Sequence, residues 1–215
     1  MKYPFVLVGS GRLAFQVAEL IMEDSGGIGY KAFSYCRHAS ESSLVPFQRI
    51  FSMPSQFAYA VAIGNPSQRE IEANFFAKIS ACATPLNIIS STCYIAKSSK
   101  IKKNSGVIAL PRAIIGSHAH IGKFALIGSG AIIEHDCNIE EFCTIGPGAV
   151  ICGSVNVGNS SFVGANATVI QSLSIGGNSI IGAGAVVIRD VGSKLLAIGN
   201  PSKTKKREKS DCNPL

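Results

Sequence analysis

The feature that most constrains the fold is an aliphatic residue that recurs every six positions through the second half of the chain. This column has 13 members: Ile115, Ile121, Ile127, Ile133, Ile139, Ile145, Ile151, Val157, Val163, Val169, Ile175, Ile181 and Val187. Glycine directly follows 8 of these 13 residues, and a small or medium-sized residue stands four positions after each one. A period of six fits neither the turn of an α-helix nor the alternation of a plain β-strand. It is typical of a β-helix built from hexapeptide repeats.

The repeat predicts a left-handed parallel β-helix in which three hexads form one triangular coil. Coils stack about 4.8 Å apart, as neighbouring strands do, and the aliphatic residue points inward. These hexads supply four coils, and an earlier set with the same step (Ile95, Ile101, Val107) supplies about one more. That set is offset by two residues, so we place a slip in phase near Leu110 and Pro111. We expect the glycines to lie at corners with a positive φ.

A single coil cannot bury its own inner face, so a β-helix is stabilised by stacking and by covering its exposed faces and ends. This favours an oligomer and a capping domain. The column four positions after the aliphatic residue contains Cys137 and Cys143, which we interpret as core residues. The seven cysteines are odd in number and lack CxxC spacing, which argues against a disulfide framework or a zinc site.

The first half of the chain alternates between strands and helices. Strands are predicted at 5–8, 32–35 and 57–63. One helix places Leu13, Val17, Leu20 and Ile21 on a single face. The other helix has Ser67 as its cap and Glu70 in a capping box. It places Ile71, Phe75 and Ile79 on a single face. The order predicts a small parallel α/β unit. We therefore divide the chain into a Rossmann-like domain at 1–90, a β-helix at 91–200 and a basic tail at 201–215.

Composition excludes several classes of protein. With 47% hydrophobic and 15% charged residues the chain is globular. No stretch approaches the roughly 20 apolar residues that span a bilayer, and the apolar run at the N-terminus is too short for a signal peptide. We expect a cytoplasmic protein without membrane insertion. The net charge of +7 is concentrated in the tail (Lys203, Lys205, Lys206, Arg207, Lys209), which is either solvated and disordered or a phosphate contact; no basic face interleaved with aromatic residues suggests nucleic acid.

The best candidate for chemistry is His135, which lies two residues after the inward Ile133 and therefore points outward. Glu134 and Asp136 flank it. A carboxylate on one imidazole nitrogen fixes the tautomer and makes the other nitrogen a better proton acceptor. A step of one coil places Gly153 over His135, which leaves space for a substrate. The alternative interpretation is a surface histidine in a charged patch.

Two other motifs point to weaker candidates. His118 and His120 share one hexad, but a third metal ligand is missing, so no metal site is predicted. The turn Gly9-Ser10-Gly11-Arg12-Leu13-Ala14 follows a strand and fits GxGxxA, a phosphate-binding pattern at a helix N-terminus. Arg37 and His38 stand where an acid would hold the ribose of NAD, so a phosphate-bearing sugar nucleotide is favoured over NAD.

With these motifs, the chain resembles the sugar acyltransferases of the PglD/NeuD type, within the hexapeptide-repeat acyltransferases. The resemblance runs from the Gly9-Ser10-Gly11-Arg12 turn through Ala62-Ile63-Gly64-Asn65 and the repeats to Ile198-Gly199-Asn200-Pro201, and its most specific segment is residues 133–139. It implies a homotrimer with acetyl-CoA in grooves between adjacent β-helices. It also implies N-acetylation of the C4 amine of a nucleotide-linked amino sugar for a surface glycan.

The resemblance also implies roles for individual residues. His135 is the general base, Asp136 tunes it, and N–H groups near Gly153 stabilise the oxyanion. The implied CoA contacts are Thr144, Gly153, Gly164, Ala165, Gly182 and Ala183, and the implied nucleotide-sugar contacts are Ser10, Gly11, Arg12 and Asn65, to which we add Arg37. No metal is implied.

The chain departs from its relatives at three places. Thr144 stands where they often have a histidine that touches CoA. Arg12 and Leu13 interrupt a turn that commonly ends in Gly-His-Gly, and Arg37 with His38 replaces acids after the second strand. Two other functions therefore stay open: O-acetylation of a sugar of the sialic acid type, and a non-catalytic nucleotide-binding β-helix. A metal-dependent hydratase on the same scaffold is a third.

Overall fold

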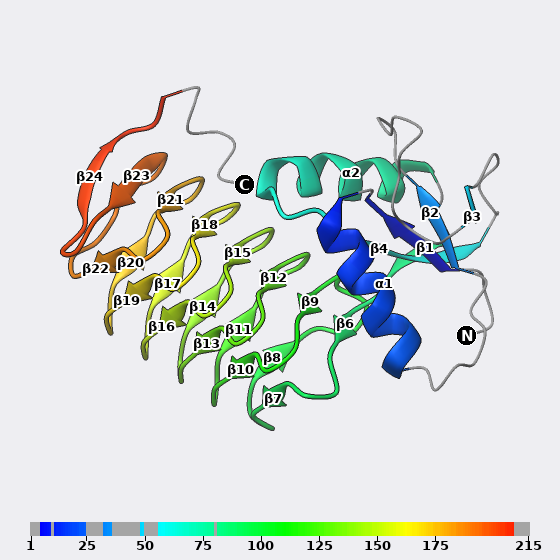
Figure 1. Cartoon of the computed structure of the whole chain (residues 1–215), viewed down its shortest axis with the longest axis horizontal. Coiled ribbons are helices and arrows are strands. Elements are labelled where there is room, and N and C mark those ends of the chain that lie inside the picture. Colours follow the sequence, from blue (N-terminus) through cyan, green and yellow to red (C-terminus); the bar gives the residue numbers. More distant parts are fainter. Residues whose placement is uncertain are drawn as a thin grey trace.

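The structure is a computed structural model that describes residues 5–9, 11–24, 32–35, 48–49, 56–79 and 81–208. It contains a triangular parallel β-helix of about six turns and a smaller N-terminal α/β unit beside the early coils (Figure 1). The coils run from green to red in Figure 1, and the N-terminal unit is blue to cyan. The predicted β-helix is therefore confirmed.

In the residues that the structure describes, the N-terminal unit is a five-stranded parallel sheet with two helices. Its elements are β1 (Phe5–Val8), α1 (Arg12–Asp24), β2 (Ala32–Tyr35), β3 (Gln48–Arg49), β4 (Phe57–Val61), α2 (Pro66–Ile79) and β5 (Ala83–Pro85). The strand order is β3-β2-β1-β4-β5, and all the pairs are parallel. The first two predicted strands are confirmed, and the third ends at Val61 instead of Ile63.

The β-helix has three faces, each named here after its first strand. The β7 face contains β7 (Tyr94–Ile95), β10 (Ile114–Ile115), β13 (Ile132–Ile133), β16 (Val150–Ile151), β19 (Thr168–Val169) and β22 (Val186–Val187). The β8 face contains β8 (Lys100–Ile101), β11 (His120–Ile121), β14 (Asn138–Ile139), β17 (Asn156–Val157) and β20 (Ser174–Ile175). The β6 face contains β6 (Ile88–Ile89), β9 (Ile108–Ala109), β12 (Leu126–Ile127), β15 (Thr144–Ile145), β18 (Phe162–Val163), β21 (Ile180–Ile181), β23 (Leu195–Ile198) and β24 (Lys203–Lys206).

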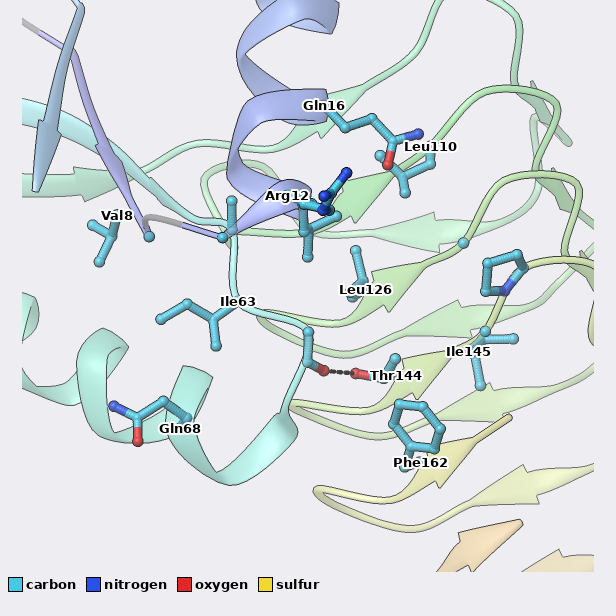
Figure 2. A pocket seen from close by; sticks show the side chains of 18 of the residues that line it. Val8, Arg12, Gln16, Ile63, Gln68, Leu110, Leu126, Thr144, Ile145 and Phe162 are labelled. Atoms are coloured by element: carbon cyan, nitrogen blue, oxygen red, sulfur yellow. Dashed lines mark hydrogen bonds between the residues drawn. The ribbon is translucent and has the colours of Figure 1, made fainter. Parts of the chain in front are cut away.

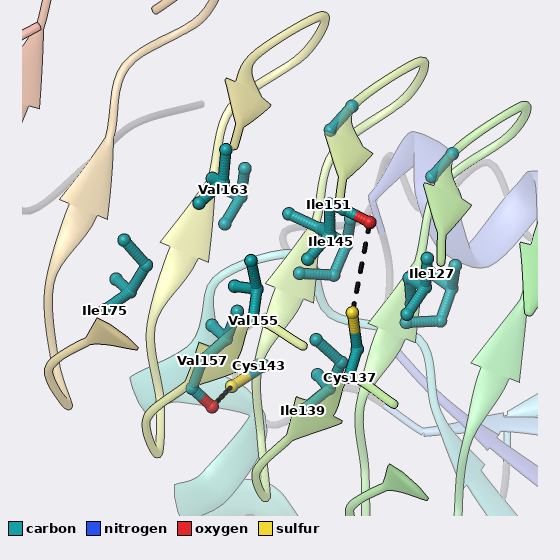
Figure 3. Packing of buried hydrophobic residues seen from close by; sticks show 14 of the residues in the cluster. Ile127, Cys137, Ile139, Cys143, Ile145, Ile151, Val155, Val157, Val163 and Ile175 are labelled. Carbon is teal, nitrogen blue, oxygen red and sulfur yellow. Dashed lines mark hydrogen bonds between the residues drawn. The ribbon is translucent and has the colours of Figure 1, made fainter. Parts of the chain in front are cut away.

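Two inward columns fill the prism, as predicted. All 13 aliphatic residues of the repeat are at most 2% exposed. Cys137 and Cys143 lie in the second column, and Figure 3 shows their sulfur atoms between neighbouring coils. Their thiols donate to carbonyl oxygens one coil later, Cys137 to Cys152 at 3.1 Å and Cys143 to Gly158 at 3.2 Å. Burial raises the pKa of Cys143 to about 12 and also raises the pKa of Cys137, so both stay neutral thiols.

The slip in phase lies earlier than predicted. From β9 onward each residue pairs with the one that lies three hexads later, as Ile108 does with Leu126. Lys100 instead pairs with His120, which lies two positions beyond three hexads. The additional residues therefore lie in the corner between β8 and β9, and not near Leu110 and Pro111.

An alanine in the inward column explains why the phase slip was predicted at the wrong position. Ala109, which pairs with Ile127, takes the place of the aliphatic residue in the coil of β9. It is fully buried, so the column itself is unbroken there. Alanine does not stand out in an aliphatic column, which is why the sequence pattern placed the slip too late.

The expected role of the repeat glycines was also wrong. Positive φ falls three positions after the aliphatic residue, as at His118 (φ 59°) and Asp136 (φ 59°), and most of these residues are not glycine. The glycine directly after the aliphatic residue instead permits close approach of the next coil. A Cβ at Gly116 would lie 2.7 Å from the carbonyl carbon of Glu134.

The predicted start of α2 needs correction. The helix begins at Pro66, whose fixed φ suits the first helical position. The backbone N–H of Gln68 donates to Asn65 Oδ1 at 3.1 Å, so Asn65, and not Ser67, caps the helix. Glu70 is not in a capping box but accepts a hydrogen bond from Ser160 Oγ at 3.1 Å.

The predicted buried face of α2 was wrong as well. Ile71 and Ile79 are 54% and 41% exposed, whereas Arg69, Ala73 and Phe76 are buried. This helix packs between the sheet of its own unit and the β-helix. Contact with the β-helix therefore determines which of its residues are buried.

Part of the predicted basic tail is a strand. Lys203–Lys206 pairs antiparallel with β23, with Lys203 opposite Ile198 and Lys206 opposite Leu195. The β-helix also begins slightly before the expected boundary, because β6 at Ile88–Ile89 already pairs with β9.

Aromatic side chains join the two units at the corner between the β8 and β6 faces. Phe124 and Phe142 stack with ring centroids 5.3 Å apart, and Phe124 stacks on Tyr59 of β4 at 6.3 Å. Leu126 and Ile108, on the outer side of the β6 face, pack in the same cluster as β1. The α/β unit thus covers the outer side of the early β6 face.

Candidate active site

His135 lies at the corner between β13 and β14, which we name the His135 corner. Its side chain is 60% exposed, and its Nδ1 lies 2.8 Å from Asp136 Oδ2. Asp136 is held in place because its backbone N–H donates to Ser117 O of the preceding coil at 2.9 Å. An ionised carboxylate only accepts hydrogen bonds, so Nδ1 carries the proton and Nε2 is free to accept one. Asp136, and not Glu134, therefore orients the imidazole.

Gly153 lies over His135, as the coil length predicts. A Cβ at Gly153 would lie 2.6 Å from His135 Cε1 and 2.7 Å from Nε2, so a larger residue would displace the imidazole. Within the described part of the chain, no oxygen accepts a hydrogen bond from the Gly153 N–H. The corner therefore combines an imidazole nitrogen with a glycine of the next coil that leaves space over it.

Four more of the predicted CoA residues stack at a different corner. Gly164 and Ala165 follow β18, and Gly182 and Ala183 follow β21, so they lie between the β6 and β7 faces. Gly128 and Gly146 belong to the same column, and we name this the glycine corner. The His135 corner and the glycine corner are the two edges of the β7 face. One coil thus carries these two sets of residues on opposite edges.

Thr144, the remaining predicted CoA residue, faces the α/β unit. It is 4% exposed, and its Oγ1 donates to Gly64 O at 2.9 Å. The structure places it at the cavity described next, and not beside His135.

A cavity of about 750 Å³ lies between the α/β unit and the β-helix (Figure 2). Its walls come from the start of α1, the segment after β4, α2, the β6 face and the glycine corner: Val8, Gly9, Gly11, Arg12, Leu13, Gln16, Ala62, Ile63, Gly64, Gln68, Glu72, Leu110, Leu126, Gly128, Thr144, Ile145, Gly146, Pro147 and Phe162. Most of these residues are apolar, with a few polar groups, as in sites for small organic ligands. Among the described residues that line it there is no histidine, and Glu72 is the only carboxylate among them.

The predicted substrate residues are only partly brought together. Gly11 and Arg12 line the cavity at the N-terminus of α1, and Figure 2 shows Arg12 beside Gln16 and Leu110. Asn65 is not part of the wall, because its side-chain oxygen caps α2. Ser10 and Arg37 lie outside the described residues.

Two charged residues of α2, one in the cavity wall and one bonded to it, were not predicted from the sequence. Glu72 lines it and is 4% exposed. Arg69 is 1% exposed and bonds to the segment after β4 and to the β-helix. Arg69 and Glu72 share one helical face with Ala73 and Phe76. The sequence pattern instead favoured the more apolar face that contains Ile71 and Ile79.

In the described segments, no group of three His, Cys, Asp or Glu side chains is placed to hold a metal ion. His120 Nδ1 instead lies 3.0 Å from Asn138 Oδ1 on the β8 face. In the part of the chain that the structure describes, neither helix is long and apolar enough to cross a membrane.

The fold is a β-helix of hexapeptide repeats with an added α/β unit. Residues 118–153 match the family model described as bacterial transferase hexapeptide (six repeats). The chain is similar over nearly its whole length to GDP-perosamine N-acetyltransferase from Caulobacter crescentus, solved as a histidine-to-alanine mutant with CoA and GDP-perosamine. Identity is 27%, coverage is 96% of this chain and 99% of that one, and the TM-score is 0.83.

Two further solved structures share the fold. The acetyltransferase domain of PglB from Neisseria gonorrhoeae FA1090, in complex with acetyl coenzyme A, is 24% identical, with 94% of this chain and 99% of that chain covered and a TM-score of 0.84. WeeI from Acinetobacter baumannii AYE is 23% identical over 94% of this chain and 99% of its own, again with a TM-score of 0.84. The predicted resemblance to sugar acyltransferases is confirmed.

Proposed function

We propose that this protein transfers the acetyl group of acetyl-CoA to the C4 amine of a nucleotide-linked amino sugar, for use in a surface glycan. The observation that carries the proposal is the His135 corner, where an aspartate-bound imidazole lies under a glycine. The likeness to a GDP-perosamine N-acetyltransferase over 96% of the chain supports the choice of substrate class.

His135 acts as general base in this proposal. Its Nε2 accepts the proton that the sugar amine loses as the nitrogen attacks, and Asp136 stabilises the imidazolium. Gly153 lies over the imidazole, and its N–H donates to the developing oxyanion in this proposal. Acetyl-CoA supplies the acetyl group as a thioester. The small residues Gly164, Ala165, Gly182 and Ala183 fit it because they keep the glycine corner free of large side chains.

The nucleotide belongs in the cavity. Arg12 and the N-terminus of α1 favour a diphosphate there, since helix N-termini attract anions. The strand order β3-β2-β1-β4-β5 supports a Rossmann-like nucleotide-binding unit. We keep Gly11 as a contact in the described chain, and Ser10, Arg37 and Asn65 as predicted contacts.

The outer sides of the three faces support a homotrimer. The β6 face is covered by the α/β unit over its early coils, and the β8 face presents polar residues such as Lys100, Asn138 and Asn156. The β7 face presents apolar residues that are half-buried or exposed: Tyr94, Ile114, Ile132, Val150 and Val186. An apolar face of this size needs a partner, and a closed symmetric oligomer supplies one.

A threefold arrangement with the β7 faces toward the axis explains why the site is divided. Each His135 corner then lies beside the glycine corner, and hence the cavity, of the neighbouring copy. The base of one copy would meet the nucleotide sugar of the next, with acetyl-CoA in the groove between them.

The proposal is tested by incubating the purified protein with acetyl-CoA and a panel of GDP- and UDP-linked 4-amino sugars and O-acetyl acceptors. Mass spectrometry with fragmentation then locates the added acetyl group. We expect N-acetylation of a 4-amino sugar. Transfer to hydroxyl groups alone would support the O-acetyltransferase, and nucleotide binding without any transfer would support a binding module.

A further inference from the structure

Arg69 is a fully buried cation that joins the two units of the molecule. Its Nε donates to Phe124 O at 2.8 Å, and its Nη2 donates to Phe142 O at 2.7 Å and Cys143 O at 3.0 Å. Nη1 donates to the carbonyl oxygens of Ile63 and Gly64. Few side chains except arginine carry enough donors, in a fixed plane, to bind all these acceptors.

The charge of Arg69 is satisfied by neutral oxygens. In the described segments no carboxylate lies within ion-pair distance of it. Burial lowers its pKa to about 9, so the guanidinium is still protonated near neutral pH. A buried charge without a counter-ion is costly, and a packed apolar contact would join the two units at a lower cost. The positions of the acceptor oxygens explain why an arginine joins the two units.

Apart from Phe124 O, the backbone acceptors of Arg69 form two groups. Ile63 and Gly64 are part of the cavity wall after β4. Phe142 and Cys143 belong to the coil that begins at the His135 corner. One planar guanidinium therefore fixes the cavity wall against this coil.

Thr144 completes the same link. Its Oγ1 accepts from Arg69 Nη2 at 2.8 Å and donates to Gly64 O at 2.9 Å, the bond drawn in Figure 2. The hydroxyl thus bridges the arginine and the cavity wall.

We propose that Arg69 is a positioning residue which, together with Thr144, holds the Ile63–Gly64 wall in place and so determines the affinity for the nucleotide-linked sugar. This inference rests on the proposed function of the cavity. The link should affect binding of the nucleotide-linked sugar and not binding of acetyl-CoA. Its two side chains contact the cavity wall, and not the His135 corner or the small residues of the glycine corner that are proposed to contact CoA.

The test compares three variants of the full-length protein. Arg69→Lys keeps the charge and loses the fork of donors, and Thr144→Val keeps the volume and loses both hydrogen bonds. Phe142→Leu is the matched control, since it weakens the aromatic contact between the units but removes no hydrogen bond to the wall. Calorimetry measures the Kd of GDP-perosamine, initial rates give the KM of acetyl-CoA, and thermal unfolding gives Tm.

We expect Arg69→Lys and Thr144→Val to weaken GDP-perosamine binding by about tenfold or more, because hydrogen bonds of buried groups are lost. The KM of acetyl-CoA should stay within about threefold. Phe142→Leu should lower Tm and leave the Kd within about threefold. If Arg69→Lys does not fold, Thr144→Val gives the same comparison.

Unchanged Kd values in both variants overturn the positioning role and leave the proposed function intact. A loss of affinity in Phe142→Leu equal to theirs also overturns it, because general docking of the units would then explain the effect. If the parent protein binds neither GDP-perosamine nor a UDP-linked 4-amino sugar, the inference and the proposed function fail together.

Discussion

The His135 corner and the cavity under the α/β unit are built in opposite ways. The corner belongs to a stack of equivalent coils, its histidine is exposed, and its position recurs once in every coil. The cavity is enclosed by unlike elements from two units, and its described lining residues include no histidine. The corner presents an exposed imidazole without enclosing walls, and the cavity has walls but no histidine among its described lining residues. We propose that neither region alone is a complete active site, and we therefore join them across neighbouring copies.

The largest expected effect is on the chemistry at the corner. His135→Ala should lower kcat by about 10²- to 10⁴-fold, because a general base is lost, while binding of nucleotide sugar to the cavity is retained. Steady-state kinetics and calorimetry on the same protein measure the two quantities. His120→Ala, an exposed histidine on the β8 face, is the control and should leave kcat unchanged. Equal losses in the two variants would refute a special role for the corner.

The next largest effect concerns stability. It compares the interior of the β-helix with the exposed side of α2. Ile139→Ala opens a void inside the prism and should reduce the free energy of unfolding by about 2–5 kcal/mol. Ile71→Ala, on the exposed side of α2, should change it by less than about 0.5 kcal/mol. Urea denaturation measures both. A large loss in Ile71→Ala would contradict the orientation of α2 described above.

A smaller effect is expected from closing the space over the imidazole. In Gly153→Ala the new methyl group meets His135 Cε1 and Nε2, so the ring must move, and we expect kcat to fall roughly 10- to 100-fold. Gly192→Ala is the control, because its Cβ would have only an ordinary contact of 3.4 Å. Tm should change little in either variant. Unchanged kcat in Gly153→Ala would mean that His135 does not act from its present position.

The smallest effect concerns the thiols. At pH 8 Cys82, which is exposed, should react with a thiol reagent, while the native Cys137 and Cys143 should not. The pKa of Cys143 is raised to about 12 in the folded state, above the value of about 8.5 in an unfolded chain. Its contribution to stability is therefore complete below about pH 8.5 and is lost as the pH rises toward 12. Mass spectrometry of labelled peptides, before and after denaturation, checks the reactivity.

The β-helix was predictable because its pattern is repeated 13 times, so that one irregular coil does not conceal the rule. Counting by coils was enough to place Gly153 over His135 and Cys143 in the core. The count went wrong where Ala109 stands for an aliphatic residue and the preceding corner is longer than the others. Periodicity thus locates side chains only while the repeat is unbroken.

The cavity was less predictable because tertiary contacts decide its walls. The turn at Gly11 and Arg12 was found from its phosphate-binding pattern. Arg69 and Glu72 were missed, because the α/β unit docks through the less apolar face of α2. Which face docks depends on Phe124 and Phe142, which lie far along the chain in the β-helix, and no local pattern contains that information.

Subunit complementation tests most directly whether the corner of one copy serves the cavity of the next. His135→Ala chains and Arg12→Glu chains, each inactive alone, are expressed together with different tags, and the mixed oligomers are purified and assayed for acetyl transfer to the nucleotide sugar. Each mixed trimer contains one shared site with both halves intact, so the purified mixed trimers should show about one third of the parent activity. Mixed trimers with no activity would place both halves of the site in a single chain and contradict this account.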